Sequence, residues 1–248
     1  MRLDRSTWMQ IEEYLRGCDG IILPMGSTEQ HGPIGLIGTD AICAEAVSEK
    51  AAEIAGALVA PTLAYTPAPF NMAFPGTISI TPETFAGFVN QIFVGLLKQG
   101  FRHFYVLNGH GANLEPLRDA AACVPNAAVR IRSWWDFPEV NALRATLYGD
   151  WEGMHATPSE IAIVEALHGT ENHAELDPPE KLSLDYIKAH AGDKHGLPDA
   201  HRTQFPDGRV GSHSSLARPE HGAELLNLAS ATVAADFTDF MMVPAGND

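Results

Sequence analysis

The sequence predicts an α/β fold, with one domain in which helices flank a mainly parallel central sheet in three layers. Short apolar runs alternate with longer segments of helical periodicity through the first half of the chain, which is typical of such a sheet. The 248 residues are 45% apolar, enough for a sizeable core. Neither an internal repeat nor a linker divides the chain, so we expect a single domain over residues 1–248.

Four apolar runs predict the strands. The first, GIILPM, is apolar throughout, as expected for a strand that is covered on both faces. The predicted strands span residues 20–25, 57–65, 103–107 and 127–134.

Helical spacing and end signals predict the helices. Thr81 precedes a proline at the first helical position, and Gly100 ends the same segment. The predicted helices span residues 40–55, 81–100, 114–122, 157–168 and 219–241. Between the last two lies a long polar loop segment at about 171–218, and loops of this length are often functional.

Charge and cysteine content exclude several classes of protein. The chain has 16 Lys and Arg against 31 Asp and Glu, a net charge of −15, which disfavours nucleic acid and anionic membranes as partners. No apolar run reaches the roughly 20 residues of a membrane span. Three cysteines without a CxxC pair do not make a disulfide framework or a thiolate metal site, so we expect a cytoplasmic protein.

Ligand-type side chains follow the first predicted strand. Glu29 and His31 lie in the loop after it, and Asp40 opens the next helix. Loops at the carboxyl ends of parallel strands form the binding sites of such folds, and carboxylates and imidazoles suit borderline divalent metals. Glu29 and His31 could equally be an exposed loop pair, and Asp40 alone is more typical of a helix start.

Two further segments carry candidate residues. His110 lies between two glycines directly after the third strand, a pattern that favours a functional role over a core position. His155 and Glu160 lie at the start of the helix near residue 157. There Thr157 and Glu160 fit a capping box, so this pattern by itself favours structural roles for both. The polar stretch around His195 fits a substrate-covering loop, a subunit contact or a solvated loop.

Taken together, these segments resemble the creatininase family of metal-dependent amidohydrolases. The likeness spans most of the chain and implies the family's three-layer fold. It is carried by LPMGSTEQHGPIGLIGTD (23–40), NMAFPGTIS (71–79), FYVLNGHGAN (104–113), the segment 153–160 and, more weakly, 208–220.

The resemblance implies a centre of two divalent ions, with zinc expected ahead of manganese or iron. By motif, Glu29 and His110 would hold one ion and His31 the other, and Asp40 would bridge both. The family's remaining carboxylate ligand would be Glu160.

Two other positions bear on this assignment. Ala112 occupies the position where creatininase proper carries a ligating Glu, which is why Glu160 is chosen. His155 matches the family histidine that shuttles a proton and titrates near neutral pH. We therefore predict His155 and Glu160 as catalytic residues.

Substrate contacts are expected from Trp134, Trp151 and His195. The chain departs from the family pattern at Ile34–Leu36, Pro158 and 211–213, which predicts a divergent member rather than creatininase itself. The resemblance also implies a small-molecule substrate and a homo-oligomer, a hexamer by likeness to the family.

The predicted reaction is the attack of a metal-bound hydroxide on a carbonyl of a small cyclic amide. Hydrolytic ring opening of a cyclic ketone, such as an oxidised cyclitol, is an alternative, as is a deformylase or peptidase activity. Two rivals come from other classes, a non-catalytic protein stabilised by metal and a flavodoxin-like nucleotide binder. The nucleotide binder ranks low because no phosphate-binding glycine loop is present.

Overall fold

A computed structural model describes residues 1–245 of the chain. Its centre is a four-stranded sheet in the order β2-β1-β3-β4, in which all neighbouring strands are parallel. The strands are β1 (Gly20–Met25), β2 (Leu58–Val59), β3 (His103–Asn108) and β4 (Ala128–Ser133). The α/β class and the mainly parallel sheet predicted from the sequence are thereby confirmed.

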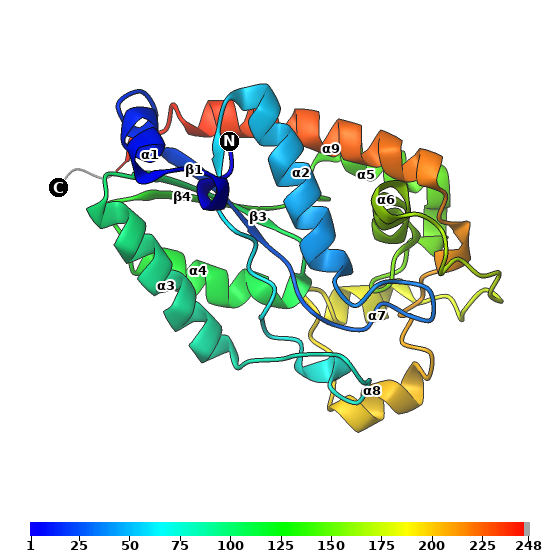
Figure 1. Cartoon of the computed structure of the whole chain (residues 1–248). Coiled ribbons are helices and arrows are strands. Elements are labelled where there is room, and N and C mark those ends of the chain that lie inside the picture. Colours follow the sequence, from blue (N-terminus) through cyan, green and yellow to red (C-terminus); the bar gives the residue numbers. More distant parts are fainter. Residues whose placement is uncertain (246–248) are drawn as a thin grey trace.

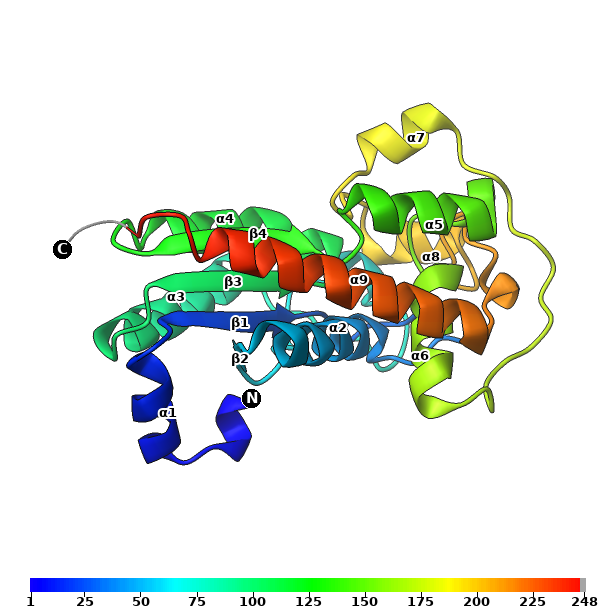
Figure 2. The ribbon, with the colours of Figure 1, turned by 90° about the horizontal axis from the view of Figure 1, so that it is seen from above.

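Helices cover both faces of this sheet (Figures 1 and 2). Successive residues of β1 point to opposite faces, because side chains alternate along a strand. Ile22 joins one apolar cluster and Ile21 the other. The Ile22 side is covered by α2 (Thr39–Ala55) and α9 (Pro219–Phe240), and the Ile21 side by α3 (Pro82–Lys98) and α4 (Leu114–Ala122).

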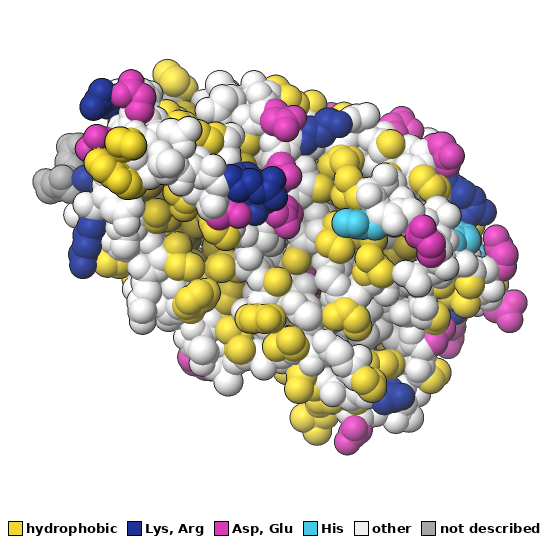
Figure 3. Space-filling view, viewed as in Figure 1, with side chains coloured by type: hydrophobic (Ala, Val, Ile, Leu, Met, Phe, Trp, Pro, Cys, Tyr) yellow, Lys and Arg dark blue, Asp and Glu magenta, His cyan; other side chains and the backbone are white. Residues whose placement is uncertain are grey.

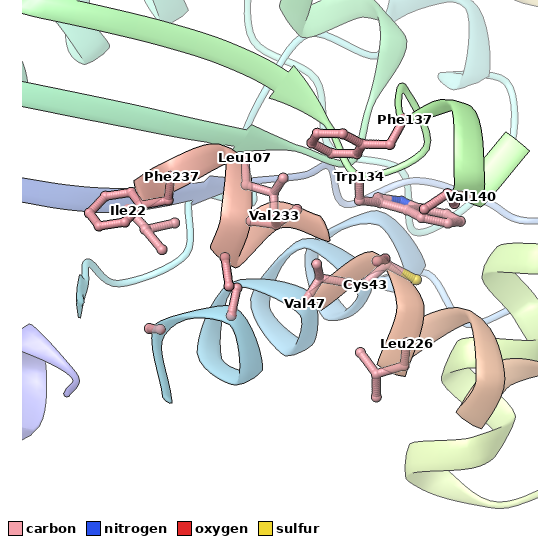
Figure 4. Packing of buried hydrophobic residues seen from close by; sticks show 14 of the residues in the cluster. Ile22, Cys43, Val47, Leu107, Trp134, Phe137, Val140, Leu226, Val233 and Phe237 are labelled. Atoms are coloured by element: carbon pink, nitrogen blue, oxygen red, sulfur yellow. The ribbon is translucent and has the colours of Figure 1, made fainter. Parts of the chain in front are cut away.

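The larger apolar cluster lies between the sheet, α2 and α9 (Figure 4). Val233 and Phe237 of α9 pack there with Ile22 and Leu107 from the strands, and Trp134 extends the cluster past the end of β4.

The remaining helices lie mostly near the carboxyl ends of the strands (Figure 2). They are α1 (Trp8–Leu15), α5 (Pro138–Tyr148), α6 (Pro158–His168), α7 (Leu184–Ala189) and α8 (Pro198–Gln204). Short 3-10 turns span Leu3–Arg5, Pro69–Asn71, Gly111–Asn113, Gly149–Trp151 and Ser214–Leu216. In Figure 2, α1 lies apart from this group, near the amino ends of β1 and β3.

The structure differs from the predicted elements in three places. The second strand is two residues long, because Pro61 in the predicted run has no N–H to continue the ladder. Helices α1 and α5 were not predicted. The polar segment at 171–218 contains two short helices, α7 and α8, joined by irregular chain.

The start of α2 packs directly against the ends of β1 and β3. A Cβ atom added to Gly26 would lie 2.3 Å from the backbone nitrogen of Ala41, and one added to Gly109 would lie 2.4 Å from the backbone oxygen of Asp40. These two glycines therefore let α2 bring Asp40 to the carboxyl edge of the sheet.

We expect Gly26→Ala to lower the free energy of unfolding by about 1–3 kcal/mol, because a helix backbone would have to move. Urea denaturation measures this change. Gly87→Ala in α3 is the control, since nothing lies within 4 Å of its added Cβ; it should raise the stability by up to about 1 kcal/mol. Equal stability of Gly26→Ala and the unchanged protein would contradict the close packing described here.

No helix of residues 1–245 is long and apolar enough to cross a membrane. On the face in Figure 3, Lys and Arg side chains are scattered among acidic ones rather than gathered in a patch.

Candidate metal centre

Four predicted ligand residues converge at the carboxyl edge of the sheet. Glu29 and His31 come from the loop after β1, Asp40 from the first turn of α2, and His110 from the loop after β3. All four side chains are buried.

His110 faces two carboxylates with one ring nitrogen. Its Nδ1 atom lies 3.0 Å from Glu29 Oε1 and 3.1 Å from Asp40 Oδ2. Its Nε2 atom lies 2.8 Å from the backbone oxygen of Pro67, to which it can only donate a hydrogen bond. In the neutral ring, Nδ1 therefore presents a lone pair to the carboxylates.

His31 repeats this arrangement on the other side of Asp40. Its Nδ1 atom lies 3.1 Å from the backbone oxygen of Glu29, and its Nε2 atom lies 2.9 Å from Asp40 Oδ1 and 3.9 Å from Glu160 Oε1. The two oxygens of Asp40 thus face the free nitrogens of two different histidines. This is the geometry expected of a carboxylate that bridges two cations.

These residues fit a pair of divalent ions. Within the described part of the chain, Glu29 Oε1 and Asp40 Oδ2 are buried and lack a hydrogen bond of acceptable geometry. A shared cation would satisfy both oxygens and the lone pair of His110 together, whereas one proton cannot. The groups Glu29–Asp40–His110 and His31–Asp40–Glu160 each bring three potential ligand atoms within 4.8 Å of one another.

The carboxylates also govern protonation of the histidines without metal. Burial opposes a charge on His31, yet Asp40 and its acidic neighbours raise the His31 pKa to about 10. The pKa of His110 is likewise raised well above its usual value, against the effect of burial, by Glu29 and Asp40. The carboxylates thus favour a positive charge at both His31 and His110, as expected of groups that can bind a cation.

Glu160 has the contacts expected of both roles that the sequence left open, a helix cap and a metal ligand. It takes part in a capping box with Thr157 at the start of α6, and its Oε1 atom faces His31. Burial raises the Glu160 pKa to about 7, so a nearby cation would favour its charged form.

We expect Glu160→Gln to lower metal affinity or activity by roughly 10-fold or more, a size seen even for residues behind the ligands. Glutamine still completes a capping box, so loss of the cap alone predicts little change. Metal content and turnover of Glu160→Gln near those of the unchanged protein would show that Glu160 only caps its helix.

His155 lies beside the centre with a fixed ring. Its Nε2 atom lies 2.7 Å from the backbone oxygen of Gln30, and its Nδ1 atom lies 3.7 Å from Glu29 Oε1. Burial lowers the His155 pKa to about 3, which differs from the near-neutral value expected from the sequence. With Glu29 and His31, His155 forms a third possible ligand group, so its position also allows metal binding.

A cavity of about 230 Å³ opens over this centre. The predicted substrate contact Trp134 lines it, together with Trp135 and Arg144. The indole nitrogen of Trp134 is buried and has no hydrogen-bond partner among the described residues.

The other two predicted substrate contacts lie elsewhere. Among the residues that the structure describes, neither Trp151 nor His195 lines this cavity. Trp151 packs against His213 and Lys181 instead. The centre of the His195 ring lies 4.7 Å from that of Phe70.

Two side chains of the centre were not predicted as site residues. Asn71 donates a hydrogen bond of 2.9 Å to Glu29 Oε2 and thereby orients that carboxylate. Asp193, from the polar segment, lies 3.7 Å from His110 Nδ1 and lines the cavity. No local pattern marks Asp193, because only the fold of the segment brings it here.

Two residues near the metal centre have an unusual backbone conformation. Among residues 1–245, Ala156 and Asp193 are the only non-glycine residues with positive φ, each at 57°. Ala156 directly follows His155, and such strain persists where surrounding structure holds it, often at functional sites.

A family model described as creatinine amidohydrolase matches residues 4–237. The chain belongs to the creatininase family. Members of the creatininase family are hydrolases that act on C–N bonds, which confirms the enzyme class predicted from the sequence.

Relatives of known function fall into more than one group. Creatinine amidohydrolase of Pseudomonas putida is 29% identical over 205 residues, 74% of each protein. 3-Dehydro-scyllo-inosose hydrolase of Thermotoga maritima is 38% identical over 106 residues, which are 42% of this chain and 34% of that protein. A mycofactocin precursor peptide peptidase of Mycolicibacterium smegmatis is 37% identical over 108 residues, 41% of this chain and 43% of the peptidase. The matched part of the chain thus spans less than half the length of two of these relatives.

Solved creatininase structures share the whole fold. A crystal structure of creatinine amidohydrolase has a TM-score of 0.82 at 25% identity, over 98% of both chains. A manganese form of creatininase has a TM-score of 0.80 at 24% identity, over 98% of this chain and 99% of that one. These values confirm the predicted three-layer fold, and the low identity fits a divergent member of the creatininase family.

Proposed function

We propose that this protein is a hydrolase with two divalent ions that opens a small, cyclic amide. The observation that carries the proposal is Asp40, whose two oxygens lie 2.9 Å from His31 Nε2 and 3.1 Å from His110 Nδ1. Glu29 and Glu160 would complete the ligand set, with zinc favoured over manganese or iron. Creatininase structures of a manganese form and a Zn–Zn type support metals of this kind.

Bound ions would lower the pKa of water toward ~7 and polarise a substrate carbonyl. Residues of the chain supply the remaining chemistry. His155 places its Nε2 proton on the backbone oxygen of Gln30, so the neutral ring presents the lone pair of Nδ1 to the centre, 3.7 Å from Glu29 Oε1. As water oxygen bonds to the carbonyl carbon, its proton would pass to Nδ1 and then to the departing nitrogen as the C–N bond breaks.

The cavity suggests the size and polarity of the substrate. Its volume of about 230 Å³ fits a small ring rather than a folded polypeptide. The unpartnered indole N–H of Trp134 would donate to a substrate oxygen, and the nearby Arg144 is held by Glu152 at 2.8 Å.

A cyclic ketone is the second candidate substrate. Similarity to the 3-dehydro-scyllo-inosose hydrolase favours it, since that match has a higher identity than the match to creatinine amidohydrolase. Addition of water to a ring carbonyl, cleavage of the adjacent C–C bond and protonation of the released carbon would use the same residues.

We expect creatinine to be a poor substrate. The chain departs from the family pattern at Ile34–Leu36 and around Pro158 and Ser212, and each unmatched buried polar group costs about 1–3 kcal/mol. Creatinine, hydantoins, lactams, formamides and oxidised cyclitols should be compared at equal metal loading. A kcat/KM for creatinine of roughly 10⁴ M⁻¹s⁻¹ or more would contradict this prediction.

The same screen tests the proposed function. Turnover of a cyclic amide that disappears with chelation and returns with Zn²⁺ or Mn²⁺ would support it. Metal binding without turnover of any compound in the set would favour a non-catalytic binding protein. The hexameric assembly and the cytoplasmic location stay predictions.

A further inference from the structure

A carboxylate from the polar segment reaches the metal centre. Asp193 lies between α7 and α8, and its side chain is 12% exposed. Its Oδ2 atom lies 3.7 Å from His110 Nδ1, the atom that also faces Glu29 and Asp40. Asp193 therefore approaches the side of the centre that belongs to His110.

The space for this carboxylate exists because residue 111 is glycine. A Cβ atom added to Gly111 would lie 2.3 Å from Asp193 Oδ2. The same oxygen accepts a hydrogen bond of 3.1 Å from the backbone nitrogen of Ala112. The loop after β3 thus accommodates the carboxylate in two ways. Gly111 leaves space for it, and the backbone N–H of Ala112 donates a hydrogen bond to it.

The charge of Asp193 has little compensation from the protein. Among the described residues, no Lys or Arg forms an ion pair with it, and the adjacent Lys194 points to Glu115. The His195 ring lies 3.9 Å from Asp193 Oδ1, and its Nε2 atom makes no hydrogen bond within the described chain. A largely buried carboxylate in this position needs a cation or a proton.

The neighbouring carboxylates favour a cation. Glu29 Oε1 and Asp40 Oδ2 are buried, lack hydrogen-bond partners among residues 1–245, and point to the same nitrogen of His110 as Asp193 does.

We propose that Asp193 is a further carboxylate of the metal centre, which stabilises the ion held by Glu29, Asp40 and His110 from its position beside His110, outside the group of three potential ligands. The inference rests on the proposed two-ion centre. It makes the polar segment part of that centre, because binding of the ion would fix the chain between α7 and α8.

Asp193→Asn tests this role, since asparagine can still accept the hydrogen bond from Ala112 and has the shape of the protonated acid. Zn²⁺ binding is measured by competition with a chromogenic chelator, and zinc content by elemental analysis. We expect one of two ions to bind roughly 10- to 100-fold more weakly, with the other unchanged. Asp185→Asn, an exposed aspartate of α7, is the matched control and should bind both ions normally.

Limited proteolysis gives a readout independent of activity. Zn²⁺ should protect residues 184–204 in the unchanged protein and in Asp185→Asn, but much less in Asp193→Asn. Gly111→Ala provides a second variant, because its Cβ atom would displace the carboxylate of Asp193. This substitution should weaken the binding of the same ion.

The outcomes separate this inference from the proposed function. If the unchanged protein binds two ions and Asp193→Asn binds them equally tightly, Asp193 does not contribute to ion binding and the inference is wrong. If the unchanged protein binds no Zn²⁺, Mn²⁺ or Fe²⁺, the two-ion centre itself is wrong and the role of Asp193 fails with it. Selective loss of one ion in both Asp193→Asn and Gly111→Ala supports the inference.

Discussion

In the Asp40→Asn variant, we expect metal content to fall from about two ions per chain to less than one. An amide nitrogen would replace one carboxylate oxygen and cannot bind a cation, and the remaining oxygen carries no full charge. Because the two oxygens of Asp40 face different histidines, either orientation of the amide disrupts one ion directly. Activity should fall by more than roughly 100-fold, since even residues behind metal ligands matter by up to that amount.

Elemental analysis and turnover measure this effect, and α3 offers the control. Asp40 and Glu83 both lie in the first turn of a 17-residue helix, where an acid favours the helix dipole. Glu83→Gln should therefore reproduce any helix effect, about 1 kcal/mol or less, with normal metal content. If Asp40→Asn behaves like Glu83→Gln, Asp40 is only a helix-start residue.

Replacing His155 by glutamine should abolish most turnover and leave the metal centre intact. The glutamine amide can still donate to the backbone oxygen of Gln30, as His155 Nε2 does, but it offers no base in place of Nδ1. We expect kcat to fall by roughly 10²- to 10⁴-fold, the usual contribution of a positioned acid–base group. Steady-state kinetics and elemental analysis on the same preparation measure both quantities.

The result also distinguishes two roles for His155. Loss of an ion in His155→Gln would make His155 a ligand within the group Glu29–His31–His155 rather than a proton carrier. Nearly normal turnover would remove it from the reaction altogether. His221→Gln is the control, because His221 lies on α9 beside Tyr148 and does not line the cavity.

The sheet could be predicted because β1 and β3 are almost continuous apolar runs and β4 alternates apolar residues with Arg130 and Arg132. The short β2 was overestimated, since the apolar composition of residues 57–65 hides the effect of Pro61 on hydrogen bonding. Helix α1 was missed although a capping box at Thr7 marks its start. The helix has only eight residues and none of them is fully buried, so its apolar pattern is short.

The candidate ligands could be predicted where they follow strands. Glu29, His31 and His110 lie directly after β1 and β3, and the parallel sheet brings such loops together. The position of Asp193 depends instead on how a long polar segment folds back over the centre, which no local pattern encodes.

Aromatic contacts were the least predictable part of the site. Trp134 follows β4 and so reaches the cavity, whereas Trp151 lies in the 3-10 turn after α5 and packs against His213. Tryptophan is common in both cores and pockets, so residue type alone could not separate the two cases.

Main-chain oxygens hold all three histidines of the centre, those of Glu29, Pro67 and Gln30. A peptide carbonyl is present whatever the side chain, so no single substitution at those positions deletes the acceptor. Ring orientation is thus specified by the path of the chain rather than by particular neighbours. Substitutions in the surrounding loops can then change which substrates bind while the three imidazole rings keep their orientation. The scaffold is therefore suited to redesign of its substrate specificity.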